Sequence, residues 1–273
     1  MGPPHPGAWR GVFTHKNTLG RLSVLALIVY WTLFRQERRH RVVWALLGLA
    51  GTVTLIGSRS ATSLAMALLL PPCWIAIQIM TRLQRAYRLA IAPFMVALIL
   101  VLSIMLPSQL ESILGFFGRD LTLTGRIPLW RTLIPIALER PLLGYGYGAF
   151  WLGERSPLAA VWARSWNPPH AHNGYLDLWL ELGLVGAVLS VLLLVLTVFR
   201  SAAWVFRENG SEISTFAFLY SVFFGLANAT ESVFLESGLN KAIYWVLLTY
   251  IYLMSRNMSV KRMHLQGTIK KVA

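Results

Sequence analysis

Charged residues are scarce in this chain of 273 residues. They make up 13% of it, while hydrophobic residues make up 56%. An ordinary soluble domain has roughly 25% charged residues, and a disordered chain needs low hydrophobicity. So few charges cannot provide a water-facing surface for a chain of this length. The composition therefore excludes both a soluble globular protein and an intrinsically disordered one.

Cysteine and acidic residues are also few. Cys73 is the single cysteine and lies in an apolar run, which excludes a disulfide framework and a zinc site made of thiolates. Lys and Arg number 25 against 11 Asp and Glu, for a net charge of +14. Such a balance suggests nucleic-acid binding in a soluble protein, but membrane proteins gather Lys and Arg in their cytoplasmic loops. We therefore expect membrane lipids, and no nucleic acid, among the partners.

Apolar residues occur in blocks long enough to cross a bilayer. A helix rises about 1.5 Å per residue and the hydrocarbon core is about 30 Å thick, so a span needs about 20 residues. Pro71 and Pro72 should kink the third span. The predicted fold is all-α: a polytopic membrane helical bundle of about seven transmembrane helices with one long extracytoplasmic loop that contains short interfacial helices. The expected spans are residues 19–34, 42–57, 60–80, 89–106, 176–199, 213–227 and 240–254.

The basic residues between the spans predict the orientation of the chain. The connections after the first, third and fifth spans, together with the C-terminal tail, hold 14 Lys and Arg. The positive-inside rule places these segments in the cytoplasm and the N-terminus outside. The chain then divides into an outward N-terminal tail with four spans, an extracytoplasmic loop, three further spans and a basic cytoplasmic tail, at residues 1–106, 107–175, 176–256 and 257–273.

Polar motifs collect on the predicted outer face, so we expect any site to open outward. The acidic residues of this face contain no DxD or ExD pair, which leaves little to bind a Mg²⁺ ion. We therefore expect no metal there. The motifs are THKN at 14–17, GSRS at 57–60, the loop at 107–175 and NATES at 228–232.

A helix is predicted within the long loop. Thr124 or Gly125 can cap it, Pro128 fits the first turn, and the helix should end near residues 139–141. We expect it to lie flat in the interface with Trp130 toward the membrane.

Glycines alternate with tyrosines directly after this helix, at Gly144, Gly146 and Gly148. Glycine adopts positive φ without strain, so the pattern predicts a tight turn. The spacing differs from GxGxxG and no GxxxxGK[ST] occurs, which excludes both kinds of nucleotide phosphate loop.

Two histidines follow a pair of prolines in NPPHAHNG. We expect the prolines to keep His170 and His172 extended, with both rings on one face, and Asn173 to cap a helix that begins near Gly174. The start of that helix directs backbone N–H groups outward and suits phosphate. A neutral imidazole near pH 7 can deprotonate a hydroxyl, so His172 is a candidate general base. A metal bound by both histidines is the alternative, although no third ligand is evident.

Five motifs in order carry a family resemblance over nearly the whole chain. HKNTLG, SRSATSL, GRIPLW, ERPLLGYGYGAFW and HAHNGYLDLWLELGLVG resemble the O-antigen ligase and polysaccharide polymerase family, including its exopolysaccharide-production members. The resemblance implies a metal-independent, inverting glycosyltransferase of the GT-C type without a cofactor. It would act at the outer face of the bacterial inner membrane on polyprenyl-pyrophosphate-linked glycans. Family members usually have more spans, and this chain begins at the HKN motif, so we expect it to be the C-terminal part of a longer protein.

The resemblance also implies two catalytic residues. In the family, an arginine of the GR motif and a histidine of the HxHN motif carry function, which here means Arg126 and His172. A guanidinium can bind a pyrophosphate through two N–H groups. Interfacial residues nearby are candidates for substrate binding or, alternatively, for anchoring in the interface: Lys16, Asn17, Arg59, His170 and Asn173.

Two other functional classes make different demands on the sequence. A transporter needs charges or broken helices at mid-membrane, and Glu181 is the nearest case in this sequence. A scaffolding membrane protein has no need of these motifs on one face. We therefore expect an enzyme that polymerises or ligates lipid-linked glycans onto a glycan or lipid acceptor. The alternative is a non-enzymatic component of polysaccharide export or transport.

Overall fold

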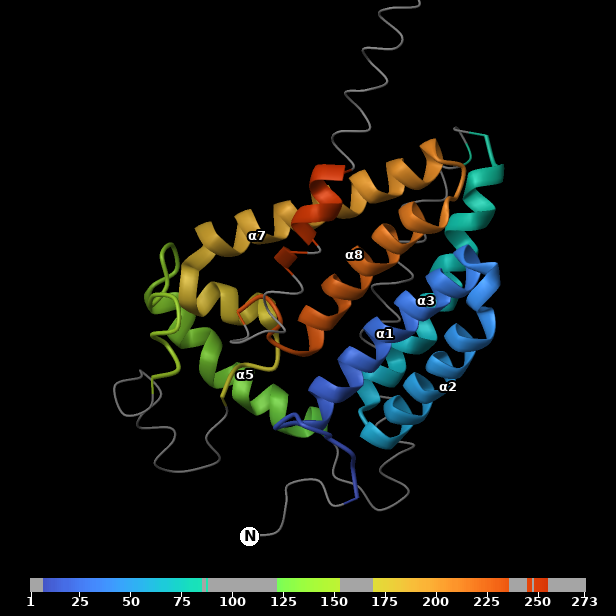
Figure 1. Ribbon diagram of the computed structural model, residues 1–273. Helices are drawn as coiled ribbons and strands as arrows, with labels where there is room; N and C mark the ends of the chain where they lie inside the picture. The colour runs from blue at the N-terminus through green and yellow to red at the C-terminus, as the bar shows by residue number, and fades with distance from the viewer. Residues whose placement is uncertain are drawn as a thin grey trace, which may run out of the picture.

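The computed structural model describes residues 7–84, 87, 122–152, 169–235, 245, 246 and 248–254 (Figure 1). Within these residues every regular element is helical, which confirms the all-α class. Five helical stretches there are long and apolar enough to cross a membrane. They are α1 (Lys16–Gln36), Arg38–Ser58 with α2 (Arg41–Ser58), α3 (Ala61–Arg82), α7 (Gly174–Arg207) and α8 (Glu212–Thr230).

These five helices match the predicted spans, and four of them differ from the prediction by only a few residues at each end. α3 runs through Pro71 and Pro72 as one helix. The span expected at 89–106 lies outside the described residues. So does part of the span at 240–254, of which residues 248–254 are helical.

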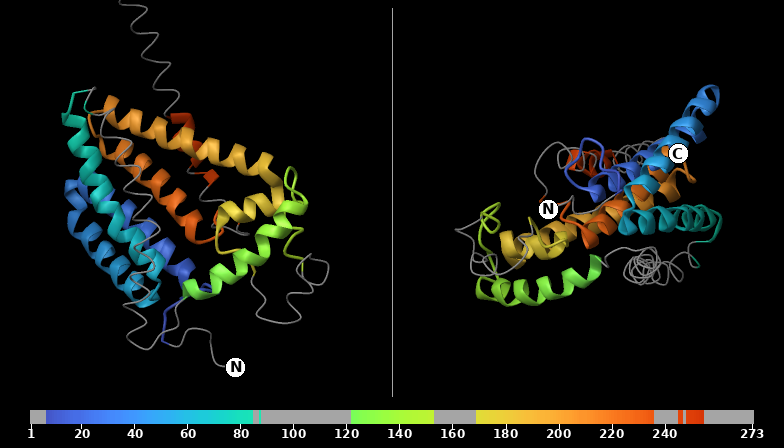
Figure 2. Two further views of the ribbon diagram at one scale, coloured as in Figure 1. Left: turned by 180° about the vertical axis from the view of Figure 1, so that it is seen from behind. Right: turned by 90° about the horizontal axis from the view of Figure 1, so that it is seen from below.

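α8 lies in the middle of the described bundle. It packs against α1 and α3 on one side and against α7 on the other, while α1 and α2 form a hairpin through a short 3₁₀ helix (Figures 1 and 2). Tyr220, Phe223 and Phe224 of α8 are fully buried and form a core with Val24 of α1 and with Phe234. This packing holds the two ends of α8 in place.

α7 departs most from its prediction because it is 34 residues long and broken at Gly183. Gly183 has φ 66° and ψ −175°, which no helix allows. The segment at 141–146 lies in the break and forms hydrogen bonds with the backbone groups that the break exposes. The hydrogen bonds run from Tyr145 N–H to Leu180 O (2.8 Å), Gly146 N–H to Glu181 O (2.8 Å), Leu184 N–H to Pro141 O (2.7 Å) and Val185 N–H to Leu142 O (3.2 Å).

The Gly-Tyr turn beside this break confirms the predicted conformation. Gly144, Gly146 and Gly148 all have positive φ. The carboxylate of Glu181 accepts a 2.6 Å hydrogen bond from the backbone N–H of Gly148. Glu181 therefore binds the turn at the break in α7, which accounts for its place inside this span.

The loop helix α5 (Thr122–Glu139) ends where the sequence predicts but begins earlier. Thr124 and Gly125 lie inside it instead of capping it, and Pro128 lies well beyond the first turn. The φ of proline suits a helix even where a hydrogen bond is lost, and α5 continues through Pro128 while packing against α7. The orientation expected for Trp130 is wrong as well. Its indole packs in a small protein core and donates to the carbonyl of Ala171 at 2.8 Å.

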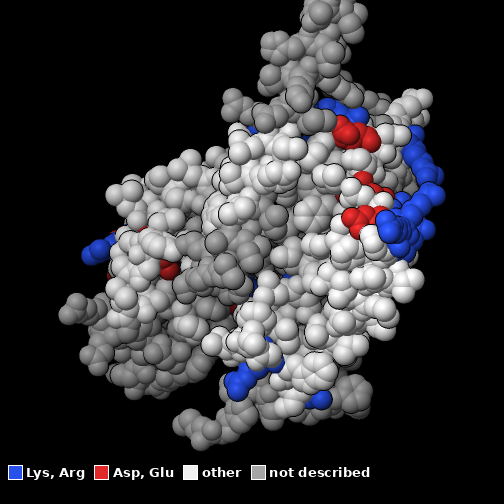
Figure 3. Space-filling view, in the orientation of Figure 1, with Lys and Arg blue, Asp and Glu red and all other residues white. Residues whose placement is uncertain are grey.

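The outer-face motifs gather at one end of the bundle. The start of α1, the turn between α2 and α3, the start of α7 and the end of α8 all lie there (Figure 1). The basic connection at 35–41 lies at the opposite end, where Figure 3 shows Lys and Arg side chains grouped at one edge. The orientation that the positive-inside rule gives from these basic residues stays a prediction.

Candidate functional site

The centre of the candidate site is a carboxylate that ends α8. Glu231 follows α8 directly, and its side chain is only 4% exposed. Its backbone N–H donates to Ala227 O at 2.9 Å, and its carbonyl accepts from Gly174 N–H at 3.1 Å. These bonds join the end of α8 to the start of α7.

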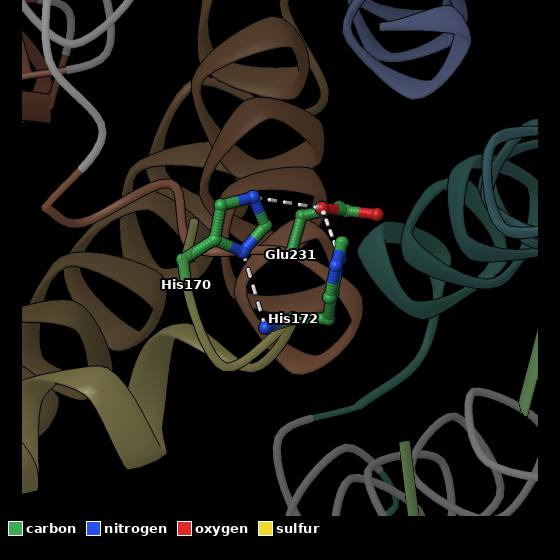
Figure 4. Close-up of side chains that lie close together, drawn as sticks. All are labelled: His170, His172 and Glu231. Carbon is green, nitrogen blue, oxygen red and sulfur yellow. Dashed lines mark hydrogen bonds and ion pairs between the residues drawn. The ribbon is translucent and has the colours of Figure 1, made fainter. Parts of the chain in front are cut away.

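Each oxygen of this carboxylate binds groups from a different part of the chain. Oε1 accepts from Asn17 Nδ2 of α1 at 2.6 Å and lies 3.4 Å from a terminal nitrogen of Arg126 in α5. Oε2 lies 3.1 Å from Nδ1 of His172 and 3.8 Å from Nε2 of His170 (Figure 4). The structure thus brings together both predicted catalytic residues and two of the predicted binding residues.

The cluster keeps Glu231 ionised. Burial alone would raise the pKa of this carboxyl, but the hydrogen bond from His172 and the positive charge of Arg21 lower it below its usual range. Burial also lowers the pKa of His170 to about 4, against the opposing pull of Glu231, so His170 is neutral at pH 7. A neutral histidine and a negative carboxylate therefore face the His172 ring.

The backbone at the histidines turns sharply, so the expectation of an extended stretch is wrong. His172 has φ 51°, in the left-handed region, and its N–H donates to Nδ1 of His170 at 3.1 Å. The two rings do share a face, with centroids 4.3 Å apart. This turn lets both rings reach one carboxylate oxygen (Figure 4).

The start of α7 does not offer its N–H groups to phosphate, contrary to the sequence-based expectation. Asn173 caps the helix as predicted, and its Oδ1 accepts from the N–H groups of Tyr175 (3.0 Å) and Leu176 (3.2 Å). The N–H of Gly174 donates to Glu231 O and that of Asp177 to Asn173 O. All four N–H groups of the first turn are thus bound within the protein, and an anion must be bound by side chains instead.

Lys16 and Arg59 lie together at the same end of the bundle. The ammonium of Lys16 is 3.5 Å from the carbonyl of Arg59, and both side chains are half-buried. Arg59 ends α2 in the left-handed conformation, and Ser60 caps α3 directly after it. This tight turn places the two cations beside the start of α1, next to Asn17.

A third potential metal ligand is present, which corrects the expectation that the histidines have none. Nitrogens of His170 and His172 and an oxygen of Glu231 lie within 4.8 Å of one another. Zinc accepts such ligands. However, Arg126 and Arg21 already compensate the carboxylate, and their charges oppose a divalent cation.

Glu231 and Arg21 were missed as site residues in the sequence. NATES was placed on the outer face, but nothing local ties Glu231 to partners that lie 214, 105 and 59 residues away. Arg21 is only 4% exposed within α1. A charged residue inside a predicted span was the available signal, because such residues face a protein interior or a polar site.

Comparison with known proteins agrees with the motifs. A family model described as O-antigen ligase matches residues 45–191, which include Arg126 and both site histidines. The exopolysaccharide production protein ExoQ of Rhizobium meliloti (strain 1021) is 30% identical over 208 residues, which cover 73% of this chain and 48% of ExoQ. The chain therefore spans about half the length of that relative. No solved structure matches the chain. The family match covers more than half of the sequence, and together with this relative it shows that the chain belongs to the O-antigen ligase family.

Proposed function

We propose that this protein is a glycosyltransferase that moves a glycan from a polyprenyl-pyrophosphate carrier to a hydroxyl of a second glycan or lipid. The reaction takes place at the outer face of the bacterial inner membrane. One observation carries the proposal: the buried carboxylate of Glu231 brings His172 and Arg126 together from separate elements. Membership of the O-antigen ligase family supports the same class of reaction.

His172 is the base in this proposal. An ionised carboxylate can only accept hydrogen bonds, so Nδ1 of His172 donates to Glu231 and Nε2 carries the lone pair. The acceptor oxygen attacks the anomeric carbon of the donor while its proton passes to Nε2. The bond from the anomeric carbon to the pyrophosphate oxygen breaks, and its electrons leave with the pyrophosphate. Attack from the side opposite the leaving group inverts the anomeric carbon.

Arg126 stabilises the departing pyrophosphate. Its side chain is only 7% exposed and contacts Glu231. A guanidinium has five N–H donors in a planar fork, so the contact to Glu231 still allows it to donate to an anion. Such a fixed cation acts most strongly in a buried site, where water screens little of its charge.

Lys16 and Arg59 are proposed to bind the phosphates of the donor, because the N–H groups of α7 are bound within the protein. Asn17 donates to Glu231 and Asn173 caps α7, so in this proposal both residues hold the site together. The reaction in this proposal uses no metal, because Arg126 supplies the positive charge at the leaving group.

The test is turnover with a polyprenyl-pyrophosphate-linked glycan in nanodiscs, measured as release of polyprenyl pyrophosphate. His172→Ala should lower turnover by roughly 10² to 10⁴ while donor binding is kept. Arg126→Ala should also weaken donor binding, and Arg126→Lys should restore only part of it, because lysine lacks the planar fork. His40→Ala is the matched control, since His40 is exposed at the opposite end of the bundle. A folded His172→Ala protein with wild-type turnover removes His172 from the mechanism.

A deletion strain separates the remaining alternatives. Loss of long surface glycans points to polymerisation, and full-length glycans left on the lipid carrier point to ligation. If the protein is a non-enzymatic export component, the purified protein should release no polyprenyl pyrophosphate, whichever glycans the deletion strain carries.

A further inference from the structure

The position of Glu231 is unfavourable on structural grounds alone. It ends α8, where the helix dipole is negative and a carboxylate is destabilising. It is also buried, and a buried charge costs several kcal/mol unless partners compensate it. An amide or hydroxyl could end this helix at lower cost. The chain instead surrounds the carboxylate with Asn17, Arg126, His170 and His172.

We infer that Glu231 is a positioning residue of the transfer reaction, which orients His172 through Oε2 and holds Arg126 beside it through Oε1. This inference rests on the proposed function. His172 bonds one oxygen and Arg126 approaches the other, so the two side chains keep a set spacing across one rigid group. The base, His172, and the cation that stabilises the leaving group, Arg126, are thereby aligned before the substrate binds.

The charge of Glu231 also serves the proton transfer. When Nε2 takes the acceptor proton, His172 becomes an imidazolium, and the carboxylate 3.1 Å from Nδ1 stabilises that cation. Other charged or titratable groups act on the same cluster from the neighbouring elements: Arg21 of α1, His15 before it, Arg126 of α5 and His170 before α7. Asp177 of α7 lies beside them and accepts from the backbone N–H of Ala171, between the two histidines. Glu231 is the carboxylate that contacts the His172 ring, so its removal takes away the negative charge nearest to the imidazolium.

Glu231→Gln tests the inference in the full chain, because glutamine keeps the size of the side chain and removes the charge. We expect turnover to fall about 10- to 1000-fold. We also expect the loss to appear in kcat and not in the acceptor KM, since Glu231 orients groups that act in the transition state. Glu212→Gln is the matched control: Glu212 begins the same helix and pairs with Arg35 at the far end, so it should leave kcat and KM unchanged.

A double variant separates positioning from mere stability. In a His172→Ala background, Glu231→Gln should lower the residual turnover by a smaller factor than it lowers the wild-type turnover, because only its action through Arg126 is left. A further drop as large as in the wild type overturns the inference, as does a Glu231→Gln enzyme whose loss lies in the acceptor KM alone.

Glu231→Asp covers the case in which Glu231→Gln does not fold. It keeps the charge but shortens the side chain, so turnover should fall more than about tenfold. Wild-type turnover in Glu231→Asp overturns the inference. Failure of the proposed function would appear differently, as wild-type turnover in the His172→Ala variant.

Discussion

The break in α7 yields a prediction that the structure makes quantitative. Gly183 has φ 66° and ψ −175°, a region essentially reserved for glycine, so an added side chain costs about 1–3 kcal/mol in backbone strain. A Cβ at this position would also collide with the carbonyl of Leu142 and the amide of Leu143, which are backbone atoms that cannot rotate away. Gly183→Ala must therefore displace the segment that fills the break.

The size of the effect follows from what that segment binds. Four backbone hydrogen bonds cross the break, and each contributes about 0.5–1.5 kcal/mol. Losing two of them together with the strain gives a destabilisation of about 4 kcal/mol. At about 2–4 °C per kcal/mol, Gly183→Ala should lower the unfolding midpoint in detergent by roughly 10 °C.

Variants of two other glycines separate the cost of backbone strain from the cost of a steric collision with the added Cβ. Gly148 has φ 70° with no atom within 4 Å of an added Cβ, so Gly148→Ala should cost only about 1 kcal/mol. Gly48 lies in α2 with equally open space, so Gly48→Ala should stabilise the protein by about 0.5–1 kcal/mol. Thermal unfolding followed by tryptophan fluorescence measures all three. A midpoint for Gly183→Ala no lower than that of Gly148→Ala would refute the role given to the segment at 141–146.

Four further predictions concern topology, pH, capping and metals. A cysteine introduced at Ser156 should react with a membrane-impermeant maleimide from the outside only, against little background from the buried Cys73; labelling only from the cytoplasm contradicts the orientation. The folded-state pKa of His170 is about 4, below the ordinary value of 6.5, so stability should be fully present above pH 6.5 and decline toward pH 4. Because this side chain is 30% exposed, we expect a loss of about 2 kcal/mol, and His170→Ala should flatten that slope. Asn173→Ala should cost about 1 kcal/mol and Asn173→Gly only a few tenths, as measured by thermal unfolding; equal losses would argue against the cap. Turnover should persist in EDTA, and full loss restored by Mg²⁺ or Zn²⁺ would replace Arg126 with a metal in the mechanism.

Local chemistry made part of this structure predictable. Asn173 begins a helix in the sequence as in the structure, because its side chain satisfies nearby N–H groups wherever that helix packs. The positive φ of Gly144 and its neighbours follows from the freedom of glycine in the same way. The spans were found from their length and apolar character, which depend on the bilayer and not on tertiary contacts.

The rest depended on contacts between distant segments. The break at Gly183 exists because residues 141–146 bind it, and the sequence around Gly183 reads as an unbroken apolar helix. The first turn of α7 was expected to bind phosphate, yet the carbonyl of Glu231, which lies 57 residues beyond Gly174, accepts one of its N–H groups. Periodicity and capping rules describe one element at a time and carry no information on such pairings.

The place of Glu231 near the end of the chain has a consequence for biosynthesis. Asn17, Arg126 and His172 are all translated before it, and each meets its partner only when residue 231 has left the ribosome. Until then, Arg21 and Arg126 lack the carboxylate that compensates their charge. Insertion of α8 into the membrane supplies the missing negative charge and draws the start of α7 onto the end of α8. A chain that stalls or is cut before α8 therefore holds every basic residue of the site and lacks the carboxylate that joins them.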